Sequence, residues 1–167
     1  MERQADRLFR SAAGLTHAQR VRRVLVRPQI GLEDSSRYHS WAMVVEHLTI
    51  IGGALADVVL ELTHRRVPGG KVSTAALKPR GGIDAAQAED GYRRMLQRFR
   101  RVILEECDDW RSPTLYPHPW FGPLDARQWV CFAPFHQTIH LKQARRIRRR
   151  VLRDDSGRGA GTVTGST

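Results

Sequence analysis

The sequence predicts an all-α protein, a four-helix bundle with long connections between its helices. Four segments repeat apolar residues every three or four positions, which is the period of an amphipathic helix. Two stretches rich in proline and glycine, 67–82 and 111–124, separate these segments as long connections. No stretch alternates apolar and polar residues for long enough to indicate a sheet. Amphipathic helices without a sheet bury their apolar faces against one another, as in a bundle.

The composition is that of one globular domain. The chain has 167 residues, of which 41% are hydrophobic and 27% charged, so a wholly disordered chain is excluded. We divide it into a helical bundle domain, 1–152, and a flexible tail, 153–167. The longest apolar stretch, Leu48 to Leu62, is interrupted by polar residues and glycines, so no membrane span is expected. Without a signal-peptide core or a disulfide framework, the expected location is cytoplasmic.

The first three helical segments have recognisable ends. The segment at about 3–25 is expected to form two short helices, the second capped by the hydroxyl of Thr16. The next helix is expected over about 40–64, and its apolar stripe continues through most of its length. A third helix is expected over about 85–106, with Asp84 as its N-cap.

The last helix carries both a start signal and an internal proline. It opens at Asp125, with Gln128 three residues later in the spacing of a capping box, and extends to about Val151. Pro134 lacks the backbone N–H that would bond one turn back, so a kink is expected just before His136.

Three histidines on the apolar stripes form a candidate metal site. His136 and His140 are four residues apart on one helix, which stacks two imidazoles about 6 Å apart at Cβ. His47 comes three residues after Val44 and four before Ile51, so it points into the bundle. Three imidazoles without partners in a core would be costly, and a metal ion removes that cost. The spacing of the pair alone leaves open that both are ordinary, partly buried histidines.

Three imidazoles do not select a single ion. Zinc or nickel is expected first, with iron, manganese or copper as alternatives. Three protein ligands leave one position for water or substrate, which is the pattern of catalytic zinc sites. An ion held in this way lowers the pKa of its bound water or of a substrate thiol. The pattern identifies no catalytic residue beyond the ligands.

Three strings in the chain resemble a known family. EDSSRYHSWAMVVEHL, at 33–48, is similar to the entry to the second helix of the DinB-like (DNA-damage-inducible) superfamily. HPWFGPLDARQW, at 118–129, and HQTIHLKQ, at 136–143, resemble the last loop and helix of the same proteins. The resemblance extends to about Val151. Close relatives often show two adjacent histidines in the last motif, where this chain has Ile139 and then His140.

The resemblance implies more than the spacing does. It implies a DinB-like four-helix bundle in up-down-down-up order, a homodimer, and a three-histidine metal site whose ligands fall on His47, His136 and His140. Some members are thiol-dependent transferases or isomerases, so the implied partners are a small-molecule substrate and a low-molecular-weight thiol. The family name refers to induction by DNA damage and does not imply DNA binding.

Further residues are candidates for the surroundings of the metal. Gln143 comes three residues after His140 and can orient its imidazole, although a plain buried amide is an equal alternative. His118 can line the metal pocket or pack structurally between two prolines, and Trp120 of the same loop is a further pocket candidate. Glu46 points about 100° away from His47 around the helix, so it is expected at the surface or an interface.

Two functional classes follow. The first is a metal-dependent enzyme, either a thiol-dependent S-transferase or a hydrolase of unknown substrate. The alternative is a non-enzymatic binding or structural bundle that contacts nucleic acid, suggested by the formal net charge of +11 and an arginine-rich last helix. The positive charge is spread along the chain and no aromatic residue interleaves with the basic run of the last helix. Nucleic acid is therefore not the expected partner.

Overall fold

A computed structural model describes residues 1–69 and 76–159, and these residues are mostly helical. The all-α prediction is confirmed. The helices are α1 (Glu2–Arg10), α2 (His17–Val21), α3 (Trp41–Thr63), α4 (Ala85–Arg101) and α5 (Ala126–Gly159). The two short helices expected at the N-terminus are α1 and α2, and the predicted helix 40–64 is α3. The predicted helix 85–106 is α4 followed by a π-helical turn, η2 (Val102–Glu106).

Two small hairpins lie in the connections and were not predicted. Strand β1 (Val24–Leu25) pairs antiparallel with β2 (Tyr38–His39), and β3 (Tyr116–His118) pairs antiparallel with β4 (Gly122–Leu124). Strands of two or three residues are too short to show an alternating pattern in the sequence. A 3₁₀ turn, η1 (Asp34–Ser36), lies in the loop between β1 and β2.

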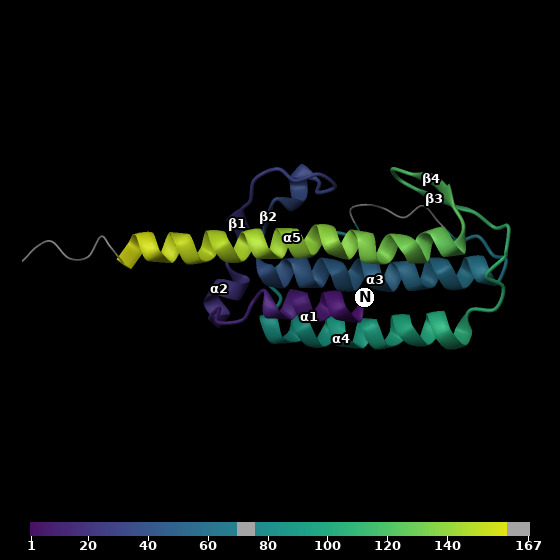
Figure 1. Cartoon of the computed structure of the whole chain (residues 1–167), viewed down its shortest axis with the longest axis horizontal. Helices are drawn as coiled ribbons and strands as arrows, with labels where there is room; N and C mark the ends of the chain where they lie inside the picture. Colours follow the sequence, from purple (N-terminus) through teal and green to yellow (C-terminus); the bar gives the residue numbers. More distant parts are fainter. Residues whose placement is uncertain (70–75, 160–167) are drawn as a thin grey trace, which may run out of the picture.

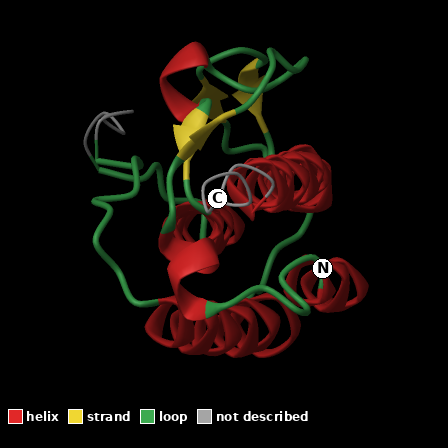
Figure 2. Cartoon of the chain, turned by 90° about the vertical axis from the view of Figure 1, so that its left-hand side faces the viewer, coloured by secondary structure: helices red, strands yellow, loops and turns green. Residues whose placement is uncertain are grey.

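The helices α1, α3, α4 and α5 lie side by side along the long axis of the molecule (Figures 1 and 2). Helix α3 contacts α4 and α5, and α1 packs against α5. Figure 1 shows that α3 and α4 run in the same direction, whereas α1 and α5 run the opposite way. Because α3 and α4 are parallel, the connection between them must return along the molecule before α4 begins.

The predicted helix caps are confirmed. Thr16 and Gln19 form a capping box, and so do Asp125 and Gln128. The carboxylate of Asp84 accepts the backbone N–H groups of the first turn of α4. Each cap satisfies N–H groups that a helix leaves free at its start, and so fixes where the helix begins.

The last helix ends later than predicted. It continues through Pro134 as one helix, with the Pro134 carbonyl accepting the Thr138 hydroxyl at 2.9 Å. The predicted tail boundary is wrong, because α5 extends to Gly159 instead of ending near residue 152. The Asp155 carboxylate pairs with the Arg22 guanidinium at 2.7 Å, and this contact holds the extension against the body of the protein. Residues 160–167 of the predicted tail lie outside the described residues.

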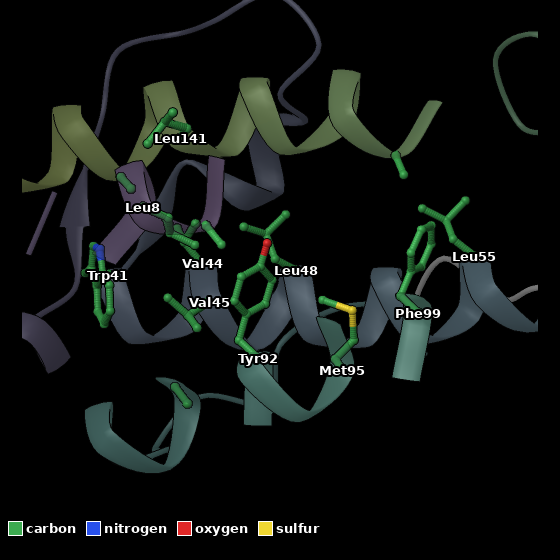
Figure 3. Close-up of a cluster of buried hydrophobic side chains, with 14 of the residues drawn as sticks. Leu8, Trp41, Val44, Val45, Leu48, Leu55, Tyr92, Met95, Phe99 and Leu141 are labelled. Atoms are coloured by element: carbon green, nitrogen blue, oxygen red, sulfur yellow. The ribbon is translucent and has the colours of Figure 1, made fainter. Parts of the chain in front are cut away.

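Part of the hydrophobic core lies where α3 meets α4 (Figure 3). Tyr92, Met95 and Phe99 point from α4 toward α3, and each is buried. A Cβ on Gly52 of α3 would overlap the side chain of Met95, so the two helices approach as closely as this glycine permits.

Helix α3 is long and apolar enough to cross a bilayer, judged by length and composition alone. Its 23 residues meet this criterion in spite of the polar residues that argued against a span in the sequence. Half of its most apolar window is buried inside the protein, as in a core helix. Such a helix is weak evidence for a membrane, since core helices of globular proteins have the same composition.

Candidate metal centre

Three histidines from two helices converge between α3 and α5. The potential ligand nitrogens of His47, His136 and His140 all lie within 4.8 Å of one another. The Nε2 atoms of His136 and His140 are 3.2 Å apart. Two ligands of one tetrahedral zinc ion, each at about 2.0–2.1 Å from the metal, are roughly 3.3 Å apart. The histidines are therefore close to the spacing that a shared ion requires.

Hydrogen bonds orient two of the three rings. His47 Nδ1 lies 3.0 Å from the carbonyl oxygen of Leu77. Because a carbonyl only accepts, Nδ1 must carry the proton, and Nε2 keeps a free lone pair. This is the tautomer in which an imidazole binds a metal through Nε2 while its other nitrogen holds the ring in place.

His140 is oriented through Gln143. The Gln143 amide nitrogen donates to the carbonyl of Ser36 at 2.7 Å, so its oxygen must face His140 Nδ1, also at 2.7 Å. The Nδ1 of His140 therefore donates, and its Nε2 is free for a ligand role. Gln143 is fully buried. Both of the alternatives considered for this residue describe it, since it is a buried amide that also positions an imidazole.

Burial keeps the three imidazoles neutral. It lowers the pKa of His136 to about 3, with further contributions from His47 and His118. It also lowers the pKa of His140 well below its ordinary value, and that of His47 more modestly. A neutral imidazole is the form that binds a metal, so no proton competes with an ion near neutral pH.

The loop before α3 is fastened to α5 at the turn that carries the ligands. Gln29 donates to the carbonyl of Ile139 at 2.8 Å. Gly31 adopts φ +79°, and a Cβ there would lie 2.6 Å from Ile139 Cδ1. The positive φ favours glycine, and any larger residue would displace the end of the Ile139 side chain. Ile139 packs beneath this loop.

The connection between α3 and α4 is fastened to two consecutive residues of α3. The Glu46 carboxylate accepts the backbone N–H groups of Arg80 and Gly81, each at 3.2 Å, while His47 donates to Leu77. Sequence reasoning placed Glu46 at the surface or an interface and missed this role. No local signal predicts it, since its partners are more than thirty residues away along the chain.

A cavity of about 480 Å³ adjoins the histidines between α3, α5 and the β3–β4 hairpin. His118 and Trp120 line it, as expected of pocket residues. His118 is also buried against Phe132, with ring centroids 4.5 Å apart, and its Nδ1 accepts the N–H of Trp120 at 3.1 Å. The same side chain therefore anchors the aromatic loop and faces the cavity, so both of its predicted roles are present.

The chain gives no significant match to any protein-family model, curated protein or solved structure. Three neutral imidazoles beside a cavity, two of them oriented by hydrogen bonds, could hold one ion with room for a further ligand.

Proposed function

We propose that this protein is a metal-dependent enzyme that binds one divalent cation through His47, His136 and His140. The observation that carries the proposal is the convergence of these three ligand atoms within 4.8 Å. Zinc or nickel is the expected ion, because imidazole suits both, and iron, manganese or copper are alternatives. The tethers from His47 to Leu77 and from His140 to Gln143 support a site that is built before the ion arrives.

The charge of the ligand set defines the chemistry. Three neutral imidazoles leave the full positive charge on the ion, so its open position favours an anionic oxygen or sulfur ligand. A bound ion of this kind lowers the pKa of a coordinated water or thiol and polarises a carbonyl oxygen. The reaction classes that fit are transfer of a group to a low-molecular-weight thiol, and hydrolysis of a small molecule.

We also propose that the chain is a DinB-like four-helix bundle. Its support is the up-down-down-up direction of α1, α3, α4 and α5, together with the three resembling strings that contain all the candidate ligands. The homodimer that the resemblance implies is part of this proposal, and size-exclusion chromatography with light scattering tests it.

A nucleic-acid-binding role has less support. Part of the basic face of α5 is engaged within the protein, since Arg146 donates to the carbonyls of Arg27 and Pro28 and Arg150 pairs with Asp154. These contacts account for some of the positive charge without an external polyanion. The metal site therefore supports the better proposal.

Metal analysis of the purified protein tests the proposed function. We expect about one ion per chain in the wild type, and loss of nearly all metal in His140→Ala and His47→Ala. His17→Ala is the matched control, because His17 is an exposed histidine outside the site. Metal retained at wild-type content in both ligand variants would refute the proposal.

A further inference from the structure

We propose that the substrate is amphipathic, with an apolar alkyl or aryl tail in the cavity between α3 and α5 and a polar head on the metal ion. This inference rests on the proposed function, because the head needs the ion. It goes further by naming the class of molecule that the site accepts.

One wall of the cavity is an uninterrupted apolar face of α3 that begins at the metal ligand. The lining residues after His47 are Ile51, Ala54, Leu55 and Val58, all on the face that carries the histidine. Val58 is eleven residues after His47, which corresponds to about 16 Å along the helix axis. The apolar lining on α3 therefore continues over this length from the histidine.

The facing wall is largely aromatic. Trp129 and Phe132 of α5 and Tyr116 of β3 line the cavity opposite α3. At the end distant from the histidines, the lining residues Val58 and Trp129 are only 6% and 7% exposed. Such a surface gains free energy by covering apolar carbon and provides few hydrogen-bond partners.

The charged groups lie at the other end. Among the described residues that line the cavity, only Glu33 and Lys78 carry a charge, and both side chains are exposed. Glu33 is near enough to His47 to raise its pKa against the larger effect of burial, and Lys78 follows the residue that His47 bonds. The charged end of the cavity is therefore the metal end, and a bound ligand lies with its polar head there and its tail toward Val58.

This polarity distinguishes between ligand classes. Hydroxyl groups placed in the half of the cavity near Val58 would lose their water partners, and each unpaired group would cost binding free energy. An alkyl or aryl tail has no such cost. The volume of about 480 Å³ lies within the range of roughly 300–1,000 Å³ typical of small-molecule sites.

The test measures how affinity depends on tail length. The full-length protein is loaded with Co²⁺ and titrated with ethanethiol, butanethiol, hexanethiol and octanethiol, and the thiolate–cobalt absorption band reports head binding. We expect affinity to rise about fourfold for each added methylene until the cavity is filled. Tryptophan fluorescence of the metal-free protein follows the tail independently, since Trp120 and Trp129 line the cavity.

A matched pair of α3 variants makes the test specific. Ala54 lines the cavity, so Ala54→Phe should fill its middle and weaken octanethiol binding at least about tenfold, the loss of two or more buried methylenes, while leaving ethanethiol unchanged. Gly53 does not line the cavity, and a Cβ there meets nothing within 4 Å, so Gly53→Phe should retain wild-type chain-length dependence.

The outcomes separate the two proposals. If cobalt binds but thiol affinity is the same for all lengths, or if both variants lose octanethiol equally, the amphipathic substrate is refuted and the metal site stands. If cobalt does not bind at the three histidines, the proposed function fails and this inference fails with it. Chain-length dependence that is lost only in Ala54→Phe supports the inference.

Discussion

The two faces of α3 are packed differently. Toward α4, the helix is filled with large apolar side chains, and even Gly52 leaves no unused space beside Met95. Toward α5, the same helix presents His47 and then borders a cavity of about 480 Å³. A cavity and buried imidazoles both cost stability. The comparison shows that one interface of α3 is filled with apolar side chains, while the other leaves a cavity beside three buried or partly buried histidines.

The largest expected effect on stability comes from a substitution in the α3–α4 interface. Phe99→Ala in the α3–α4 interface should lower the free energy of unfolding by about 3–5 kcal/mol, because it removes a buried aromatic ring and leaves a cavity. Urea denaturation measures the change, and metal content at low temperature should be preserved. Phe135→Ala, on an exposed part of α5, is the control and should change stability by less than about 0.5 kcal/mol. Equal effects of the two variants would contradict the division between the faces.

The sequence predicted the histidine set because its signals are local. The stripes of α3 and α5 point His47, His136 and His140 inward, and the caps at Thr16, Asp84 and Asp125 mark helix starts within a few residues. A residue's own neighbours along the chain contain this information.

The sequence did not predict the features that depend on distant partners. Glu46 gained its role from Arg80 and Gly81, and the end of α5 depends on Arg22. No periodicity or capping rule connects positions so far apart. The cavity is also a property of three elements together, so the stripe of α3 alone did not reveal that part of it faces open space.

A second prediction concerns the histidine cluster between α3 and α5. Gln143→Leu removes the acceptor for His140 Nδ1 and should weaken metal affinity 10–100-fold, about 1.4–2.7 kcal/mol. Competition with a chromophoric chelator measures it. Gln143→Glu keeps an acceptor oxygen for His140 but loses the N–H that the Ser36 carbonyl accepts, so its metal affinity should lie between those of the wild type and Gln143→Leu. An unchanged affinity in Gln143→Leu would show that the ring needs no such support.

The third prediction concerns the pH dependence of stability that the buried His136 causes. The pKa of His136 is about 3 in the folded protein and ordinary in the unfolded chain. Between these values only the unfolded state binds the proton, so stability is lost as pH falls below about 6.5. The loss approaches about 1.4 kcal/mol per pH unit for each such histidine. Urea denaturation of metal-free wild type and His136→Gln at several pH values measures it, and equal slopes for the two proteins would argue against a buried neutral imidazole.

The smallest expected effect is an increase in stability from a substitution in the α3–α4 interface. The Tyr92 hydroxyl is buried and has no hydrogen-bond partner among the described residues. Tyr92→Phe should therefore raise the free energy of unfolding by about 1 kcal/mol, because it removes an unpaired polar group and keeps the ring. Chemical denaturation measures the change. A decrease would mean that the hydroxyl is bonded, for example to a buried water molecule.

The separation of the ligands along the chain has a consequence for biosynthesis. His47 and His140 come from α3 and α5, and all of α4 is translated between them. A ribosome must therefore release most of the polypeptide before the three histidines can meet. A nascent chain that ends before α5 contains only His47 of the three. The three histidines thus come together late in synthesis, after the α3–α4 interface has all the residues it needs to form.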